Sequence, residues 1–81
     1  MINKGVYTGD LNNIPVAIDK VTFYRAATVA SNKPSTSAGL VETMYMDGGD
    51  YAIQRFTSIE ASARIWIRSK REGSWNTWVE K

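Results

Sequence analysis

The chain has 81 residues, no cysteine, no histidine and a formal net charge of +2. This length gives one small domain, which buries roughly 60–65 % of its unfolded surface and has no disulfide to strengthen a thin core. The absence of histidine and cysteine excludes the usual zinc, haem and iron–sulfur ligand sets, and so small a net charge does not by itself indicate a nucleic-acid-binding protein. We expect self-association to supply part of the stability.

The chain contains no apolar run near the roughly 20 residues that a membrane-spanning helix needs, so we expect no membrane insertion. Its N-terminal residues lack the apolar centre of a signal peptide. Residues 1–12 are expected to be a lead-in from an upstream shaft, and residues 1–81 form a single domain.

Strand signals separated by turn residues dominate, which predicts a mainly β fold. Residues 14–19 are expected to carry one short helical turn near the N-terminus. Residues 21–25 alternate in polarity as a strand does, and Phe23 is assigned a structural role on one face. Residues 30–39 are rich in Ser, Asn, Pro and Gly and predict a long loop, a kind of loop that is often functional.

The second half of the chain predicts an antiparallel meander with long loops. Its strands cover residues 40–46, 51–57, 63–69 and 75–81. The Asp-Gly-Gly-Asp sequence at residues 47–50 favours a hairpin turn, because it supplies residues that tolerate positive φ angles.

The strand at residues 63–69 carries the strongest functional signal. Alternation places Ile65 and Ile67 on one face, as structural core residues, and Arg64, Trp66 and Arg68 on the other. The second set is a candidate saccharide site, because an indole stacks on a pyranose ring and guanidiniums bind hydroxyls or acidic substituents. The alternative is that Trp66 packs on a neighbouring strand or protomer, with the arginine stems covering its edges.

Four further residues complete the candidate set. Trp78 is predicted to be structural, as the plug at one end of the sheet, and to stabilise the fold more than Trp66. Trp75 is a candidate sugar contact. Gln54 has both a donor and an acceptor for a saccharide hydroxyl, or else satisfies nearby backbone groups. Arg55 is its neighbour and a candidate ligand contact.

We expect no metal, no cofactor and no enzymatic activity. Asp47 and Asp50 flank two glycines, but calcium requires about six to eight oxygen ligands, so turn formation explains them better. Without His or Cys the common catalytic triads and thiol chemistry are excluded. A glycosidase needs two carboxylates about 5–9 Å apart in a cleft, whereas the eight acids here are scattered.

The order of the motifs resembles the knob-type C-terminal domains of bacteriophage tail fibres and R-type pyocin fibres. The resemblance covers residues 10–81 and is strongest from Gly39 onward. The matching segments are Asp10-Leu-Asn, Phe23-Tyr-Arg, the Pro/Ser/Gly loop, Gly39-Leu-Val-Glu, Tyr51-Ala-Ile-Gln-Arg-Phe-Thr, Ile65-Trp-Ile-Arg and the terminal Gly73-Ser-Trp-Asn-Thr-Trp-Val.

The resemblance implies a receptor-binding domain at the distal end of a virion tail fibre. Its expected partners are a bacterial cell-surface polysaccharide or lipopolysaccharide and, through the fibre, two further copies of the chain in a homotrimer. Two alternatives stay open. One is a structural domain that trimerises or caps the same fibre and has no ligand of its own. The more remote one is a sheet that binds single-stranded nucleic acid by stacking aromatic side chains on bases.

Overall fold

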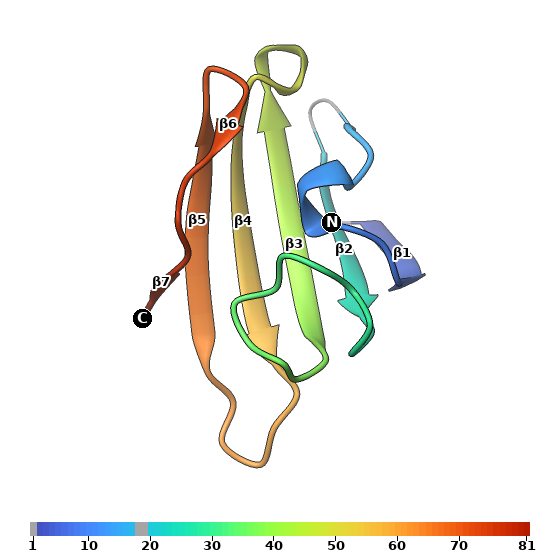
Figure 1. Ribbon diagram of the computed structural model, residues 1–81. Coiled ribbons are helices and arrows are strands. Elements are labelled where there is room, and N and C mark those ends of the chain that lie inside the picture. Colours follow the sequence, from blue (N-terminus) through green and yellow to red (C-terminus); the bar gives the residue numbers. More distant parts are fainter. Residues whose placement is uncertain (1, 18–19) are drawn as a thin grey trace.

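A computed structural model describes residues 2–17 and 20–81 as one sheet of seven strands, mostly antiparallel, with two 3₁₀ turns (Figure 1). The strands are adjacent in chain order from β1 to β6, and β7 also pairs with β5. The elements are β1 (Ile2–Tyr7), η1 (Leu11–Asn13), β2 (Val21–Ala26), β3 (Gly39–Met46), η2 (Asp47–Gly49), β4 (Tyr51–Ser58), β5 (Ile65–Arg71), β6 (Ser74–Trp75) and β7 (Val79–Glu80).

Strand alternation divides the sheet into a covered inner face and an open outer face. In β3 and β4 every second residue is buried and the residues between them are exposed or half-buried. The register places the inner residues Val41, Phe56 and Trp66 side by side across three strands. These residues form the centre of the inner face, because alternation directs them all to the same side.

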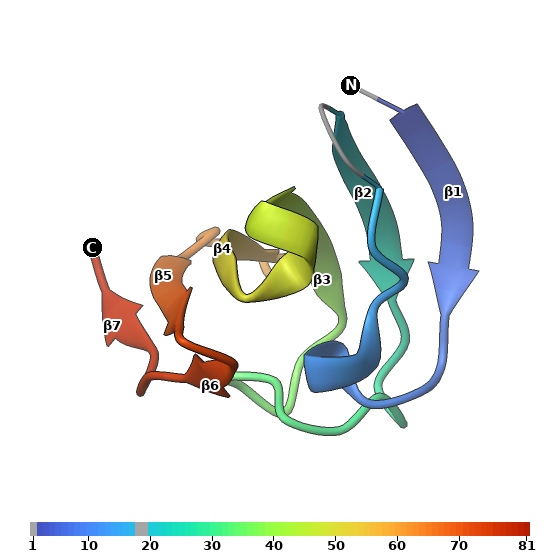
Figure 2. The same cartoon turned by 90° about the horizontal axis from the view of Figure 1, so that it is seen from above.

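The inner face is covered by irregular segments rather than by a second sheet. Figure 2 shows η1, the loop after β2 and β6 gathered on one side of the strands. The Phe56 ring lies 6.0 Å from the Trp66 ring and 6.2 Å from the Trp78 ring, in edge-to-face contacts typical of aromatic cores. The core residues are Leu11, Ile14, Tyr24, Ala26, Ala30, Val41, Phe56 and Trp66.

The β3–β4 hairpin confirms the predicted turn. Asp47, Gly48 and Gly49 adopt φ angles of 52°, 66° and 101°, the left-handed conformations that this turn sequence tolerates.

Gly39 begins β3 where the chain lies directly against the Phe56 ring. A Cβ atom there would overlap that ring and the Thr57 carbonyl oxygen, so the glycine permits close packing.

The predicted mainly β class is confirmed, with three local differences. The helical turn lies at Leu11–Asn13 rather than at residues 14–19, of which residues 18 and 19 are outside the described part. Residues 2–7 form β1, which pairs in parallel with β2, so the sheet is not wholly antiparallel. Residues 75–81 are not one strand, because the segment between β6 and β7 leaves the edge of β5.

The assignment of faces on β5 was wrong. Ile65 and Ile67 are half-buried on the outer face, and Phe23 is likewise half-buried there rather than in the core. Trp66 and Arg68 are each only 6 % exposed on the inner face. Alternation fixes which residues share a face, but which face is covered depends on η1 and the loops, which the local pattern of β5 does not reveal.

Candidate functional site

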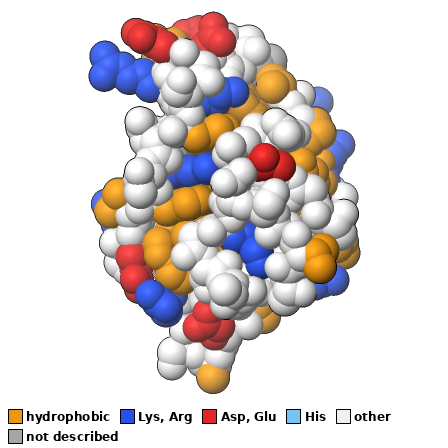
Figure 3. All heavy atoms as spheres, in the orientation of Figure 1, with side chains coloured by type: hydrophobic (Ala, Val, Ile, Leu, Met, Phe, Trp, Pro, Cys, Tyr) orange, Lys and Arg blue, Asp and Glu red, His pale blue; other side chains and the backbone are white. Residues whose placement is uncertain are grey.

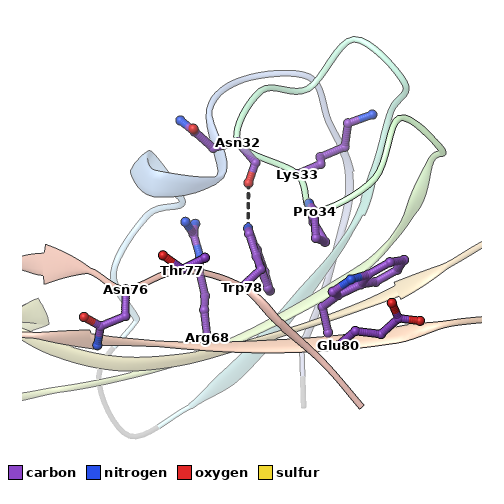
Figure 4. A pocket seen from close by; sticks show the side chains of 9 residues that line it. Asn32, Lys33, Pro34, Arg68, Asn76, Thr77, Trp78 and Glu80 are labelled. Atoms are coloured by element: carbon purple, nitrogen blue, oxygen red, sulfur yellow. Dashed lines mark hydrogen bonds between the residues drawn. The ribbon is translucent and has the colours of Figure 1, made fainter.

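An open groove of about 530 Å³ lies on the inner face, between the loop after β2 and the C-terminal segment. Figure 3 shows this face in the orientation of Figure 1. Hydrophobic side chains are visible on it, with lysine or arginine side chains among them. Figure 4 shows the groove from close by. Its lining residues are Asn32, Lys33, Pro34, Trp66, Arg68, Asn76, Thr77, Trp78 and Glu80.

Hydrogen bonds hold the loop wall of the groove in place. The Trp78 indole Nε1 donates to the Asn32 carbonyl oxygen at 3.0 Å, which ties the C-terminal segment to the loop (Figure 4). Lys33 Nζ donates to the carbonyl oxygens of Thr28 at 2.7 Å and Ser37 at 3.2 Å, so this ammonium closes its own loop. The groove is therefore pre-formed, which lowers the entropy cost of binding a ligand.

Asp10 fixes the side chain of the same loop residue, Asn32. Its Oδ1 accepts hydrogen bonds from Asn32 Nδ2 at 2.7 Å and from the Asn12 backbone N–H at 2.8 Å. These two bonds, with a smaller contribution from Arg68, lower the pKa of the Asp10 carboxyl despite the opposing effect of burial. The carboxylate caps η1 and places Asn32 at the groove in one arrangement.

Arg68 is the central charged residue of the groove. Its guanidinium carbon lies 4.2 Å from the centre of the Trp75 ring and 4.5 Å from that of Trp78, so the two indoles enclose it. Nε donates to Gln54 Oε1 at 2.8 Å, whereas Nη2 is buried with no hydrogen-bond partner among residues 2–17 and 20–81. Burial lowers the pKa of Arg68 to about 10, so the side chain remains charged at neutral pH.

Gln54 is structural and not a ligand contact. Its side chain is 0 % exposed, and Nε2 donates to the Leu11 carbonyl oxygen at 2.9 Å and to Thr43 Oγ1 at 3.2 Å. Because its Oε1 also accepts from Arg68, this amide joins η1, β3 and β5. The second of the two roles considered for Gln54, satisfying nearby polar groups, is the one observed.

Arg64 and Trp66 do not form an exposed sugar platform. The Arg64 guanidinium lies 4.7 Å from the centre of the Trp66 ring and covers the indole. It also makes a two-pronged ion pair with Glu80, at 2.8 Å and 2.7 Å. The shared hydrogen bonds raise the pKa of Arg64 and lower that of Glu80. Arg64 is thus neutralised at the rim, and Trp66 contributes mainly to the core.

The structure separates Arg55 from the other candidates. It lies exposed on the outer face, with its Nε 3.9 Å from Glu42 Oε1. Trp75 is half-buried, and its Nε1 donates to the Asn12 carbonyl oxygen at 3.3 Å, so it forms one wall around Arg68. The groove does bring together Trp66, Arg68 and the predicted loop.

Sequence reasoning missed the polar rim of the groove. Asn76 and Thr77 lie between the two tryptophans of the terminal motif, and Asn32 lies in the long loop. A polar pair between two aromatic residues was the available signal for the first two. Trp78, assigned only to structure, also lines the groove and is half-buried there.

Comparisons of the chain with protein-family models, curated proteins and solved structures found no match. Within residues 2–17 and 20–81, no three His, Cys, Asp or Glu side chains gather as a metal site would require. None of the helices in this described part is long and apolar enough to cross a bilayer.

Proposed function

We propose that the groove binds a saccharide of the bacterial cell surface, a polysaccharide or lipopolysaccharide, and that the chain is a receptor-binding domain of a phage tail fibre in the virion. The observation that carries the binding part is the combination of a half-buried indole, Trp78, with amide and hydroxyl side chains on the same groove. Trp78 supplies an apolar surface, and the Thr77 hydroxyl with the side-chain oxygens of Asn32 and Asn76 supplies directional hydrogen bonds, the two things a sugar needs. The side-chain nitrogens of the two asparagines already donate to Asp10 and Ser69 and hold these residues in place. The motif order that resembles fibre knobs supports the assignment to a fibre.

The groove is open, so each site should bind weakly. A shallow site leaves much of its ligand in contact with water, and its affinity is correspondingly low. Several copies on one fibre would raise the apparent affinity by about 10²–10⁴ when they engage one polysaccharide together. The proposed function therefore depends on multivalent presentation.

The outer face supports the proposed homotrimer. It carries the exposed apolar residues Leu40, Met44 and Ile53 in one area, which in a soluble domain favours contact with another surface. The Glu42–Arg55 pair lies among them, and both side chains remain partly accessible. A surface with one acid beside one base can meet a copy of itself with opposite charges facing each other.

Charge exchange tests this association. Glu42→Arg and Arg55→Glu should each weaken self-association of the 81-residue chain in sedimentation, because like charges then face each other. An equal mixture of the two variants should regain part of it, since each then meets its opposite charge. A wild-type chain that stays monomeric, or a mixture no better than the single variants, would contradict assembly through this face.

Glycan binding tests the groove itself. The chain can be biotinylated, displayed on streptavidin and applied to an array of bacterial surface polysaccharides. We expect Asn76→Ala and Thr77→Ala to reduce retention by at least about tenfold, because each removes hydrogen bonds in every copy. Thr57→Ala on the outer face is the matched control and should bind as wild type. If no glycan is retained, or all variants bind equally, the proposal fails and a purely structural capping role is favoured.

A further inference from the structure

We propose that Arg68 reads an acidic group, a carboxylate or phosphate carried by the bound saccharide; this inference rests on the proposed saccharide function. The groove would then select acidic over neutral sugars. The Arg68 guanidinium, and not that of the exposed Arg64 at the rim, would make the selective contact.

The buried guanidinium of Arg68 has an unsatisfied donor within the described residues. Arg68 is 6 % exposed and charged at neutral pH, and its Nη2 donates to nothing within the described residues. Leaving a buried charged donor unsatisfied costs folding free energy, so such a group indicates either strain or a missing ligand. Nε is already occupied by Gln54, so Nη2 is the buried nitrogen left for an outside acceptor.

Arg68 also forms no ion pair within the described residues. The ion pairs of the described part are Arg55 with Glu42 and Arg64 with Glu80, and neither includes Arg68. Asp10 is the carboxylate whose charge acts on Arg68, but its Oδ1 already accepts two hydrogen bonds from Asn12 and Asn32. A buried cation without a paired anion is costly, and a bound oxyanion would remove that cost.

The shape of the surroundings also favours an oxyanion at Arg68. Trp75 and Trp78 hold the guanidinium between two rings, which fixes its plane and lowers the entropy lost when an oxyanion binds in a two-pronged manner. In Figure 4 the Arg68 side chain rises beside Thr77 and Trp78, whereas Glu80 lies at the other end of the groove. An acidic group should therefore bind at the Arg68 end, away from the Glu80 carboxylate.

The groove wall must open for an oxyanion to reach Nη2, because that atom is buried. Thr77 lines this wall beside Arg68 (Figure 4), so we expect it to shift. The shift is feasible because Thr77 belongs to the segment between β6 and β7, two strands of only two residues each. Strands this short contribute few ladder hydrogen bonds, so local opening costs less than at the centre of the sheet. Asn76 and Trp78, on either side of Thr77, stay bonded to Ser69 and Asn32, so the opening is confined to Thr77.

A matched pair of sugars tests the inference. Oligosaccharides of glucuronic acid and of glucose share the pyranose ring and differ in the carboxylate, so ¹⁵N-detected titrations of the 81-residue chain can compare them directly. We expect the glucuronate oligomer to bind at least about tenfold more tightly, the ratio that one charge-assisted hydrogen bond supplies. The Arg68 Nε–H signal should shift with glucuronate and not with glucose.

Variants and inorganic phosphate separate the outcomes. Arg68→Gln should abolish the preference, whereas the control Arg71→Gln, at an exposed position of the same strand, should keep it. If Arg68→Gln does not fold, the Arg68 Nε–H signal of wild type decides. Equal binding of both sugars with a shifted Trp78 signal would overturn this inference and leave the proposed function intact. Binding of neither sugar would overturn both this inference and the proposed function. Inorganic phosphate should move the Arg68 signal less than glucuronate, and an equal shift would show an anion site that is independent of saccharide.

Discussion

The two faces of the sheet use the same strands for opposite purposes. On the inner face η1, the loop after β2 and the C-terminal segment cover Phe56, Trp66 and Gln54 almost completely. On the outer face Met44 and Ile53 stay 40 % and 41 % exposed, although Ile53 belongs to the same strand as Phe56 and Gln54 and Met44 to the adjacent β3. Covering by loops, and not strand pattern, therefore decides where this domain has its core.

Neighbouring residues show how sharp this division is. Gln54 is fully buried and bonded to three partners, whereas Arg55, the next residue, is exposed with one long ion pair. The inner face should thus carry most of the stability and the candidate groove. The outer face should tolerate substitution in the monomer and affect association.

The largest expected effect comes from the centre of the inner face. Phe56→Ala should lower the free energy of unfolding by about 3–5 kcal/mol, because it leaves a cavity among the core aromatics. Ile53→Ala, on the outer face of the same strand, should change it by about 0.5 kcal/mol or less. Urea denaturation measures both, and Phe56→Leu replaces Phe56→Ala if the latter does not fold. Similar losses for the two positions would break the distinction between the faces.

The tryptophans give the second comparison. Trp66 is 6 % exposed, and Trp78 is half-buried at the edge of the core. This burial now favours the reverse of the order expected from sequence: Trp66→Ala should cost about 3–5 kcal/mol and Trp78→Ala less. Thermal unfolding of both variants checks the order. A larger loss for Trp78 would restore the original expectation and show that its hydrogen bond to Asn32 outweighs burial.

Gln54 and Arg55 sharpen the comparison at the level of single hydrogen bonds. Gln54→Ala should cost about 1–3 kcal/mol for each buried partner it leaves unsatisfied, such as Arg68 Nε or the Leu11 carbonyl. Arg55→Ala should have little effect, since exposed ion pairs contribute about 0–1 kcal/mol. Chemical denaturation again provides the measurement, and equal effects would mean that the buried network is not a source of stability.

The smallest expected effect is the contribution of the Asp10 carboxyl to the free energy of unfolding and its loss in acid. Because its folded pKa is lowered from the usual 3.8, ionised Asp10 stabilises the fold above that pH, and the contribution disappears as pH falls through the lowered pKa. Asp10→Ala should cost about 1 kcal/mol at pH 7, a typical value for a cap. Asp10→Asn keeps an acceptor and should flatten the stability curve below about pH 4. A curve identical to that of wild type would exclude this carboxyl as a source of acid sensitivity.

Sequence reasoning predicted the regular part of the fold and missed what depends on distant contacts. The β3–β4 hairpin follows from alternation and from the Asp-Gly-Gly turn, both local signals. β1 was missed because its parallel pairing with β2 is a long-range contact, and its residues are mostly exposed and show little pattern. The loop at residues 30–39 was predicted from composition alone.

The candidate site was predicted only in part, again because local signals reveal strand faces but not contacts between distant segments. Trp66 and Arg68 were placed on one face correctly, because strand alternation joins them, and the long loop expected from composition lines the same groove. The prediction that Ile65 and Ile67 form the core failed, because the covering segments come from elsewhere in the chain. The neutralisation of Arg64 by Glu80, 16 residues away, has no local signature.

The most direct test of the account is to map where a surface polysaccharide contacts the domain. The ¹⁵N-labelled chain is titrated with the best binder from the glycan array, and the perturbed backbone and indole signals are assigned. If the groove on the inner face binds the saccharide, we expect signal shifts at Asn32, Asn76, Thr77 and the Trp78 indole. We expect none at Met44 or Ile53 on the outer face. Shifts confined to the outer face would contradict a binding groove on the inner face and reassign the ligand to the opposite side of the sheet.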